Sequence, residues 1–144
     1  MNPIKILYVE DNEGDILLFE NAIDESGIYY ALDVVRNGNE AIRFLNKEKN
    51  YADKKTPDII LLDINMPEMN GFELLDIVKA DENLKQLPVF MFTTSSSQQD
   101  ILIAYKKYAN SYFIKPTLEN EFDKLIKGIE YYWFNLAILP TQMN

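Results

Sequence analysis

Short apolar runs alternate along the chain with longer segments in which apolar residues recur every three or four positions. The runs are rich in β-branched and aromatic residues, which favour strands, and they span residues 4–9, 31–35, 58–62, 89–92 and 111–114. The segments between them have helical spacing. We predict helices over residues 13–26, 38–48, 72–80, 98–108 and 118 to about 139.

This alternation indicates an α/β fold. Parallel strands need crossover connections, which helices supply, and the runs at 4–9 and 58–62 are apolar nearly throughout, as in strands covered on both faces. We therefore expect a doubly wound, five-stranded parallel sheet with helices on both faces. No repeat or linker divides the sequence, so we expect one domain over residues 1–144. The longest connection, residues 46–57, is charged, and we interpret it as a solvated loop without chemistry.

Composition excludes several classes of function. The formal net charge of −9 repels nucleic acid and anionic lipid surfaces, so neither is an expected partner. The chain has no Cys and no His, which excludes disulfides, thiolate or imidazole metal sites and Ser/His/Asp catalysis. If the protein takes part in phosphohistidine chemistry, the histidine must belong to a partner, because this chain has none. The sequence has neither a signal-peptide pattern nor about 20 consecutive apolar residues for a membrane span, so we expect a cytoplasmic protein.

Three acidic residues follow two of the predicted strands. Glu10 and Asp11 come directly after the first strand, and Asp63 follows the third. Ligands of such sheets bind outside the carboxyl ends of the strands, where the strand order reverses. If these strands are neighbours, the three like charges raise one another's pKa unless a cation intervenes. An oxygen-only site of this kind suits Mg²⁺.

Two further strands end at the same edge of the predicted sheet. The fourth ends with the hydroxyl of Thr93, and the fifth ends with the ammonium group of Lys115. Acids, a metal ion, a hydroxyl and an ammonium group together can neutralise the oxygens of a transferring phosphoryl group. A carboxylate can attack phosphorus and form an acyl phosphate. We predict Asp63, at the centre, as the acceptor.

Each of these residues also has a purely structural interpretation. Glu10 and Asp11 could begin a loop and cap the next helix, and Asp63 could cap the turn that follows it. Thr93 and Lys115, taken singly, are an ordinary strand-end hydroxyl and an ordinary surface lysine. The occurrence of all of them at one edge favours the phosphoryl site.

Four segments resemble the signature segments of the bacterial response regulator receiver domain. They are LYVEDN, LLDINMPEMNG, PVFMFTT and YFIKP, which occur in the family's order and spacing. The resemblance extends over essentially the whole chain. The resemblance implies a flavodoxin-like fold and phosphorylation of Asp63 by a sensor histidine kinase. It also implies a phosphoacceptor that catalyses its own phosphotransfer and dephosphorylation and is otherwise not an enzyme.

The resemblance assigns a role to each residue of the metal site. Asp11 and Asp63 would bind Mg²⁺ through their side chains, and Asn65 would bind it through its backbone carbonyl. Glu10 stands where Asp is more usual in the family and would act through water.

The remaining motif residues would bind and sense the phosphoryl group. By resemblance, Thr93 and Lys115 hold its oxygens, and Tyr112 is the aromatic switch residue that turns inward as Thr93 moves. Tyr112 could equally be a core residue. The bond between Lys115 and Pro116 would be the family's cis peptide, as X-Pro sequences permit. Phosphorylation would then change the face formed by the fourth helix, fifth strand and fifth helix.

Three positions depart from the usual pattern or vary within it. Thr94 stands where the family mostly has a small residue, which would narrow access to Asp63. Asn65 and Ser95 occupy variable positions that resemble the family's tuners of self-dephosphorylation.

The last predicted helix is unusually long and is apolar nearly all round, which indicates an interface. We predict that this interface includes Tyr132, Trp133, Phe134 and Leu136, although the segment could instead fold back on its own domain. The long helix ending at Leu139-Pro140, the EDNEGD opening and the long second crossover resemble the stand-alone regulators paired with bacterial phytochromes. The resemblance implies a homodimer through the last strand and helix, and a phytochrome-type kinase as partner.

Two other functions fit part of the pattern. Phosphatases of the haloacid dehalogenase type also use an aspartyl phosphate and Mg²⁺, but they have a second Asp where this chain has Asn65, and their nucleophile follows the first strand. A receiver that only docks to partners would not need an intact acid cluster with Thr93 and Lys115.

Overall fold

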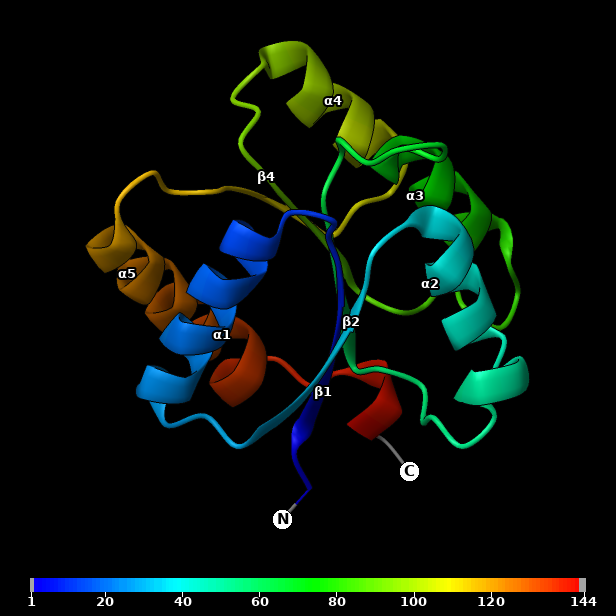
Figure 1. Cartoon of the computed structure of the whole chain (residues 1–144), viewed down its shortest axis with the longest axis horizontal. Helices are drawn as coiled ribbons and strands as arrows, with labels where there is room; N and C mark the ends of the chain where they lie inside the picture. The colour runs from blue at the N-terminus through cyan, green and yellow to red at the C-terminus, as the bar shows by residue number, and fades with distance from the viewer. Residues whose placement is uncertain (1, 143–144) are drawn as a thin grey trace.

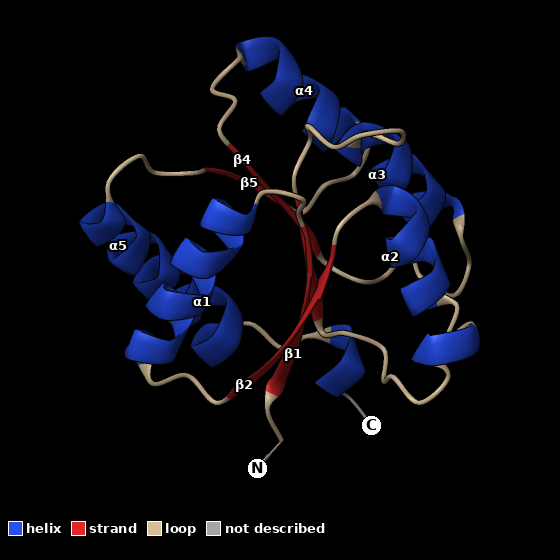
Figure 2. Cartoon of the chain, in the orientation of Figure 1, coloured by secondary structure: helices blue, strands red, loops and turns tan. Residues whose placement is uncertain are grey.

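The computed structural model describes residues 2–142, which form a three-layer α/β structure (Figure 1). Five parallel strands make one sheet in the order β2-β1-β3-β4-β5. The strands are β1 (Ile4–Val9), β2 (Tyr30–Val35), β3 (Ile59–Leu62), β4 (Val89–Thr93) and β5 (Ser111–Ile114). The helices are α1 (Glu13–Ser26), α2 (Gly38–Leu45), α3 (Gly71–Ala80), α4 (Gln98–Lys106) and α5 (Glu119–Ile129). Helices α1 and α5 cover one face of the sheet, and α2, α3 and α4 cover the other (Figure 2).

The predicted fold class and element order are confirmed. Strands β1 and β5 and helix α1 have the predicted bounds, and the other strands differ by one residue at one end. Helix α2 is shorter than predicted, because the chain leaves it at Leu45. The connection that follows contains a 3₁₀ turn (Lys49–Tyr51), whose Tyr51 donates a 2.7 Å hydrogen bond to Glu40 Oε1 and packs on Phe44. This loop therefore contributes to packing, which its charged sequence did not indicate.

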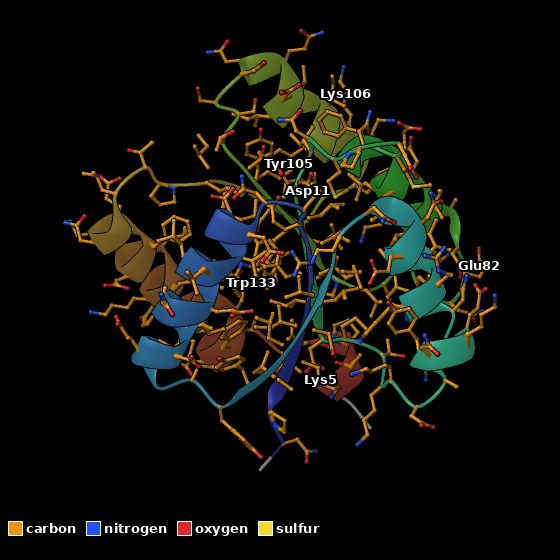
Figure 3. The ribbon with its side chains drawn as sticks, viewed as in Figure 1. Lys5, Asp11, Glu82, Tyr105, Lys106 and Trp133 are labelled. Carbon is orange, nitrogen blue, oxygen red and sulfur yellow. The ribbon has the colours of Figure 1, made fainter. Side chains whose placement is uncertain are left out.

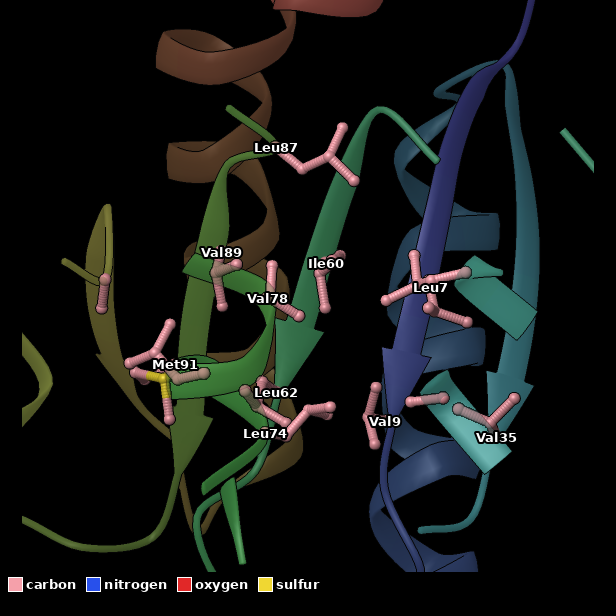
Figure 4. Close-up of a cluster of buried hydrophobic side chains, with 14 of the residues drawn as sticks. Leu7, Val9, Val35, Ile60, Leu62, Leu74, Val78, Leu87, Val89 and Met91 are labelled. Carbon is pink, nitrogen blue, oxygen red and sulfur yellow. The ribbon is translucent and has the colours of Figure 1, made fainter. Parts of the chain in front are cut away.

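Alternation along the strands divides the core into two clusters. In β1, Leu7 and Val9 face α2 and α3, while Ile6 and Tyr8 face α1 and α5. All four residues of β3 are buried, as expected of a central parallel strand. Figure 4 shows the first cluster, in which apolar residues of α3 pack on β1, β3 and β4. The two packed faces fix the strand ends from which the candidate site is built.

The C-terminal segment differs from the single long helix predicted. Helix α5 ends at Ile129, and a π-helical segment (Glu130–Leu136) follows before the chain crosses beneath the sheet. There Leu139 is buried and the Thr141 hydroxyl donates to the Asp58 carboxylate. The predicted helix to about residue 139 is therefore wrong in its second part: the segment is π-helical rather than α-helical from Glu130, and it ends at Leu136.

The predicted interface residues fall into two groups. Trp133 packs on Phe90 with ring centroids 4.6 Å apart, and Phe134 packs on the same core, so both fold back on their own domain. Tyr132 and Leu136 remain 55% and 58% exposed. A contact with another chain is therefore open to Tyr132 and Leu136, whereas Trp133 and Phe134 already stabilise this domain. No helix within residues 2–142 is long and apolar enough to cross a membrane.

Candidate functional site

The three predicted acids lie together at the carboxyl end of the sheet. Strands β1 and β3 are neighbours, with Val9 paired with Leu62, so the residues that follow them emerge side by side. Carboxylate oxygens of Glu10, Asp11 and Asp63 all lie within 4.8 Å of one another. Figure 3 places Asp11 at this end of β1 and Lys5 at the opposite end. The strand order reverses between β1 and β3, which is where ligands of such sheets bind.

Lys115 reaches these acids from the end of β5. Its ammonium group is buried, hydrogen-bonds to Glu10, lies 2.9 Å from Asp15 Oδ2 and lies 3.5 Å from Asp63 Oδ2. Burial alone lowers the pKa of Lys115, but hydrogen bonds to Asp15 and Glu10 and the charge of Asp63 raise that pKa by more. Lys115 is therefore a permanent cation facing the predicted acceptor.

Glu10 is fully buried and already hydrogen-bonded by the protein. Its Oε1 accepts from Lys115 and from the Tyr8 hydroxyl at 3.3 Å, and its Oε2 accepts from the backbone N–H groups of Asp11 at 3.1 Å and Asn12 at 3.3 Å. Burial, with a contribution from Asp63, raises the pKa of Glu10 to about 7 although the Lys115 hydrogen bond lowers it. These contacts leave Glu10 suited to an indirect role.

The donor set fits a hard divalent cation. It contains carboxylate oxygens only, and the buried Lys115 is shared among three acids, so negative charge remains to be compensated. Asp11 is exposed and Asp63 largely buried, so an ion between them would be held at the edge of the sheet. Asn65 lies two residues beyond Asp63 in the exposed loop, and its role as a carbonyl ligand stays a prediction.

Two residues of the site were missed by sequence reasoning. Tyr8 is completely buried between Phe19 and Phe92, and burial together with nearby acids raises the pKa of its hydroxyl. Asp15, in the first turn of α1, is the second partner of Lys115. The signal for Tyr8 was its position two residues before Glu10, which puts both on one face of the strand. The signal for Asp15 was the cluster of acids in EDNEGD.

Thr93 and Tyr112 are both hydrogen-bonded to Ser95, in the loop that follows β4. Thr93 is buried at the end of the strand, and its Oγ1 accepts a 3.4 Å hydrogen bond from Ser95 N. Tyr112 is half-buried and donates a 2.9 Å hydrogen bond to the Ser95 carbonyl. Thr94 is exposed at the start of this loop. The switch role of Thr93 and Tyr112 stays a prediction. Both residues are hydrogen-bonded to the same residue, Ser95.

The predicted cis peptide between Lys115 and Pro116 is wrong. No peptide bond within residues 2–142 is cis. The trans form is intrinsically favoured even before proline, by about 0.5–1 kcal/mol. With this bond trans, the Lys115 ammonium group reaches the carboxylates of Glu10, Asp15 and Asp63.

Gly71 positions the acceptor through a close backbone approach. It begins α3 behind the Asn70–Glu73 capping box, and its N–H donates a 2.8 Å hydrogen bond to the Ile64 carbonyl. A Cβ at residue 71 would lie 2.2 Å from the Asp63 carbonyl oxygen and 2.9 Å from Ile64 Cα. The residue therefore must be glycine for α3 to pack against the end of β3.

We predict that Gly71→Ala destabilises the protein by about 3 kcal/mol, because backbone atoms rather than a flexible side chain must move. Denaturant unfolding would measure this loss. Gly128→Ala is the matched control, since a Cβ at helical residue 128 meets nothing within 4 Å, and it should stabilise by about 0.5–1 kcal/mol. Equal stability of Gly71→Ala and the wild type would contradict the close approach.

The fold and the acid cluster together define the class of protein. A doubly wound parallel sheet with acids after β1 and β3 and a lysine after β5 is the arrangement that the sequence resemblance implied, and the response regulator receiver domain model matches residues 6–127. The chain therefore belongs to the response regulator receiver family, whose members are signalling proteins rather than classical enzymes.

Its relatives are regulators of similar length. Response regulator Rcp1 of Synechocystis sp. (strain ATCC 27184 / PCC 6803 / Kazusa) is 35% identical over 141 residues, covering 97% of this chain and 96% of Rcp1. The phosphorylated cyanobacterial phytochrome response regulator RcpA superposes with a TM-score of 0.90 and 38% identity, over 96% of this chain and 99% of RcpA. The Mn²⁺-bound form of Rcp1 gives a TM-score of 0.88 and 34% identity, over 96% and 99%. These matches confirm the resemblance to stand-alone phytochrome response regulators.

Proposed function

We propose that this chain is the phosphoacceptor of a two-component relay and that Asp63 receives a phosphoryl group from a histidine kinase. One observation carries the proposal. The Asp63 carboxylate lies at the end of β3 with oxygens of two other acids within 4.8 Å and the Lys115 ammonium 3.5 Å away. A buried carboxylate with both a candidate cation site and a fixed ammonium group beside it is arranged for an incoming phosphoryl group.

Asp63 acts as the nucleophile in this proposal. One of its carboxylate oxygens attacks phosphorus, the bond from phosphorus to the imidazole nitrogen breaks, and the imidazole leaves with that electron pair and takes up a proton. Lys115 and the Thr93 hydroxyl hold oxygens of the transferred group. Asp11, Asp63 and the Asn65 carbonyl would hold Mg²⁺, which neutralises phosphoryl charge when bound, while Glu10 acts through water.

The modified site would then change the face formed by α4, β5 and α5. Thr93 turns toward the phosphoryl oxygens and Tyr112 turns inward, which shifts the equilibrium between two conformations of this face. Exposed Leu102, Tyr105 and Ile114 on α4 and β5 would present the result to a protein target.

Intact mass measurement tests the acceptor role. The wild-type protein is incubated with acetyl phosphate, once with MgCl₂ and once with a chelator. We expect a gain of one phosphoryl group only with Mg²⁺, because the ion neutralises charge on the phosphoryl oxygens. As the bond from Asp63 to phosphorus forms, the phosphorus–oxygen bond to acetate breaks and acetate leaves. No gain in either condition would contradict the proposal and favour a receiver that only docks to partners.

The proposed donor is a phytochrome-type sensor histidine kinase, and the cytoplasm is the proposed location of this chain. Several related structures are phytochrome response regulators, including RcpA at 38% identity over 96% of this chain. Neither nucleic acid nor membrane is a proposed partner, in keeping with the net charge of −9.

We further propose a homodimer that uses the exposed apolar residues of the C-terminal segment. Leu136→Glu should convert the dimer to a monomer in sedimentation, because it places a charge among exposed Tyr131, Tyr132 and Ile138. Trp133 is a poor probe, since its substitution would also disturb the packing on Phe90. Leu17→Glu, at an equally exposed leucine of α1, is the control. A wild type that sediments as a monomer with and without acetyl phosphate would contradict the dimer.

A further inference from the structure

Ser95 links three parts of the chain that the proposed signal must connect. Its backbone N–H donates to Thr93 Oγ1 at 3.4 Å, and its carbonyl accepts from the Tyr112 hydroxyl at 2.9 Å. Its own hydroxyl donates a 2.6 Å hydrogen bond to Asp100 Oδ2, in the first turn of α4. Ser95 therefore contacts Thr93 at the end of β4, Tyr112 of β5 and the start of α4.

The serine hydroxyl also organises the start of α4. Ser95 Oγ accepts a 3.3 Å hydrogen bond from Ser97 N, and Ser97 is the N-cap whose side chain accepts from Asp100 N at 3.2 Å. Asp100 is thus held at its carboxylate by Ser95 and at its backbone by Ser97. A displacement of Ser95 must either carry the first turn of α4 with it or break a short hydrogen bond to a charged group.

Thr93 supplies the displacement. In this structure its Oγ1 accepts from Ser95 N, so a Thr93 hydroxyl that turns toward a phosphoryl group on Asp63 must release Ser95 or draw it along. If Ser95 is drawn along, the Tyr112 hydroxyl, which is hydrogen-bonded to the Ser95 carbonyl, moves in the same step. Both expected switch residues consequently act on α4 through one residue between them.

We propose that Ser95 is a positioning residue that couples phosphorylation of Asp63 to helix α4 through its hydroxyl hydrogen bond to Asp100. This inference rests on the proposed function, because the phosphoryl group on Asp63 starts the movement. It gives Ser95 a role separate from any effect on the lifetime of the phosphorylated state.

Hydrogen exchange of α4 in the wild type and in Ser95→Ala tests the coupling. Each protein is held with acetyl phosphate and MgCl₂, the extent of phosphorylation is read from intact mass, and exchange at the amides of residues 101–104 is compared with that of the unmodified protein. We expect Ser95→Ala to accept the phosphoryl group, and the α4 response of each protein is divided by its measured extent of phosphorylation. The phosphorylation-dependent change in α4 protection of Ser95→Ala should fall about tenfold, the equilibrium effect of one hydrogen bond to a charged group.

Matched variants separate coupling from a general effect on the loop. Ser96→Ala, at the exposed neighbouring serine, should leave the α4 response unchanged, and Ser95→Thr, which keeps the hydroxyl, should restore it. Asp100→Ala should reproduce Ser95→Ala, and the double variant should be no worse than either single one, as residues acting through one bond require.

Two results would overturn the inference. A full α4 response in phosphorylated Ser95→Ala would show that the signal does not pass through this hydroxyl. Additive effects of Ser95→Ala and Asp100→Ala would show that the two residues act separately. Failure of the proposed function is distinguishable from both, since the wild type would then gain no phosphoryl mass and would have no signal for Ser95 to carry.

Discussion

Asp63→Asn should abolish the gain of a phosphoryl group from acetyl phosphate. The asparagine amide has nearly the size of the carboxylate but is not a nucleophile toward phosphorus near neutral pH, so no acyl phosphate forms. The variant should still fold, because removing one charge from the cluster with Glu10 and Asp11 relieves repulsion. Intact mass after incubation with acetyl phosphate and MgCl₂ measures the loss.

The control must be another aspartate that the reagent can reach. Asp53 is exposed in the loop between α2 and β3, so Asp53→Asn should gain the phosphoryl group to the same extent as the wild type. Labelling of Asp63→Asn at the wild-type rate would place the acceptor elsewhere. Loss of labelling in both variants would point to damage to the fold, which a circular dichroism spectrum would reveal.

The sequence predicted the parts of this site that depend on strand order. Alternating β and α segments require crossovers, and a parallel sheet brings every strand's carboxyl end to one edge. Strand order therefore predicts that Glu10, Asp11, Asp63, Thr93 and Lys115 lie at one edge of the sheet. The structure brings Glu10, Asp11, Asp63 and Lys115 into direct proximity and ends β4 at Thr93.

Features that depend on side-chain reach were not predictable in the same way. Asp15 is a first-turn helix residue of an ordinary kind, and only the path of the Lys115 side chain makes it part of the site. Gly71 has the sequence of plain turn chemistry, and its contact with the Asp63 backbone depends on how closely α3 approaches β3. Such distances come from packing, which local sequence does not specify.

The C-terminal segment shows a similar limit. Its apolar character predicted an interface, with folding back on its own domain as the alternative, but periodicity did not distinguish a partner chain from the chain's own core. Trp133 packs on Phe90 of its own domain. Leu139 is buried, and the Thr141 hydroxyl donates a hydrogen bond to Asp58. Whether these side chains pack on their own domain or on a partner depends on the space beside α1 and α5, which is a property of the folded domain.

Lys115→Met should destabilise the metal-free protein by about 3–5 kcal/mol, the usual cost of removing one partner from a buried ion pair. Methionine keeps much of the lysine stem, so the loss isolates the ammonium group from packing. Without this group Glu10 loses its cationic partner while fully buried, and Asp63 and Asp15 lose theirs. Denaturant unfolding in chelator measures the difference.

Addition of Mg²⁺ should offset part of the stability that Lys115→Met loses. An ion that binds the folded state stabilises it by mass action, and Lys115→Met should gain more from Mg²⁺ than the wild type does, because more negative charge is uncompensated in the variant. Lys124→Met, at an exposed lysine of α5, should change stability by less than about 0.5 kcal/mol and leave the response to Mg²⁺ as in the wild type. If Lys115→Met unfolds like Lys124→Met in chelator, the acids do not depend on Lys115 for compensation. In that case protonation of Glu10, whose pKa is raised to about 7, would have to supply it.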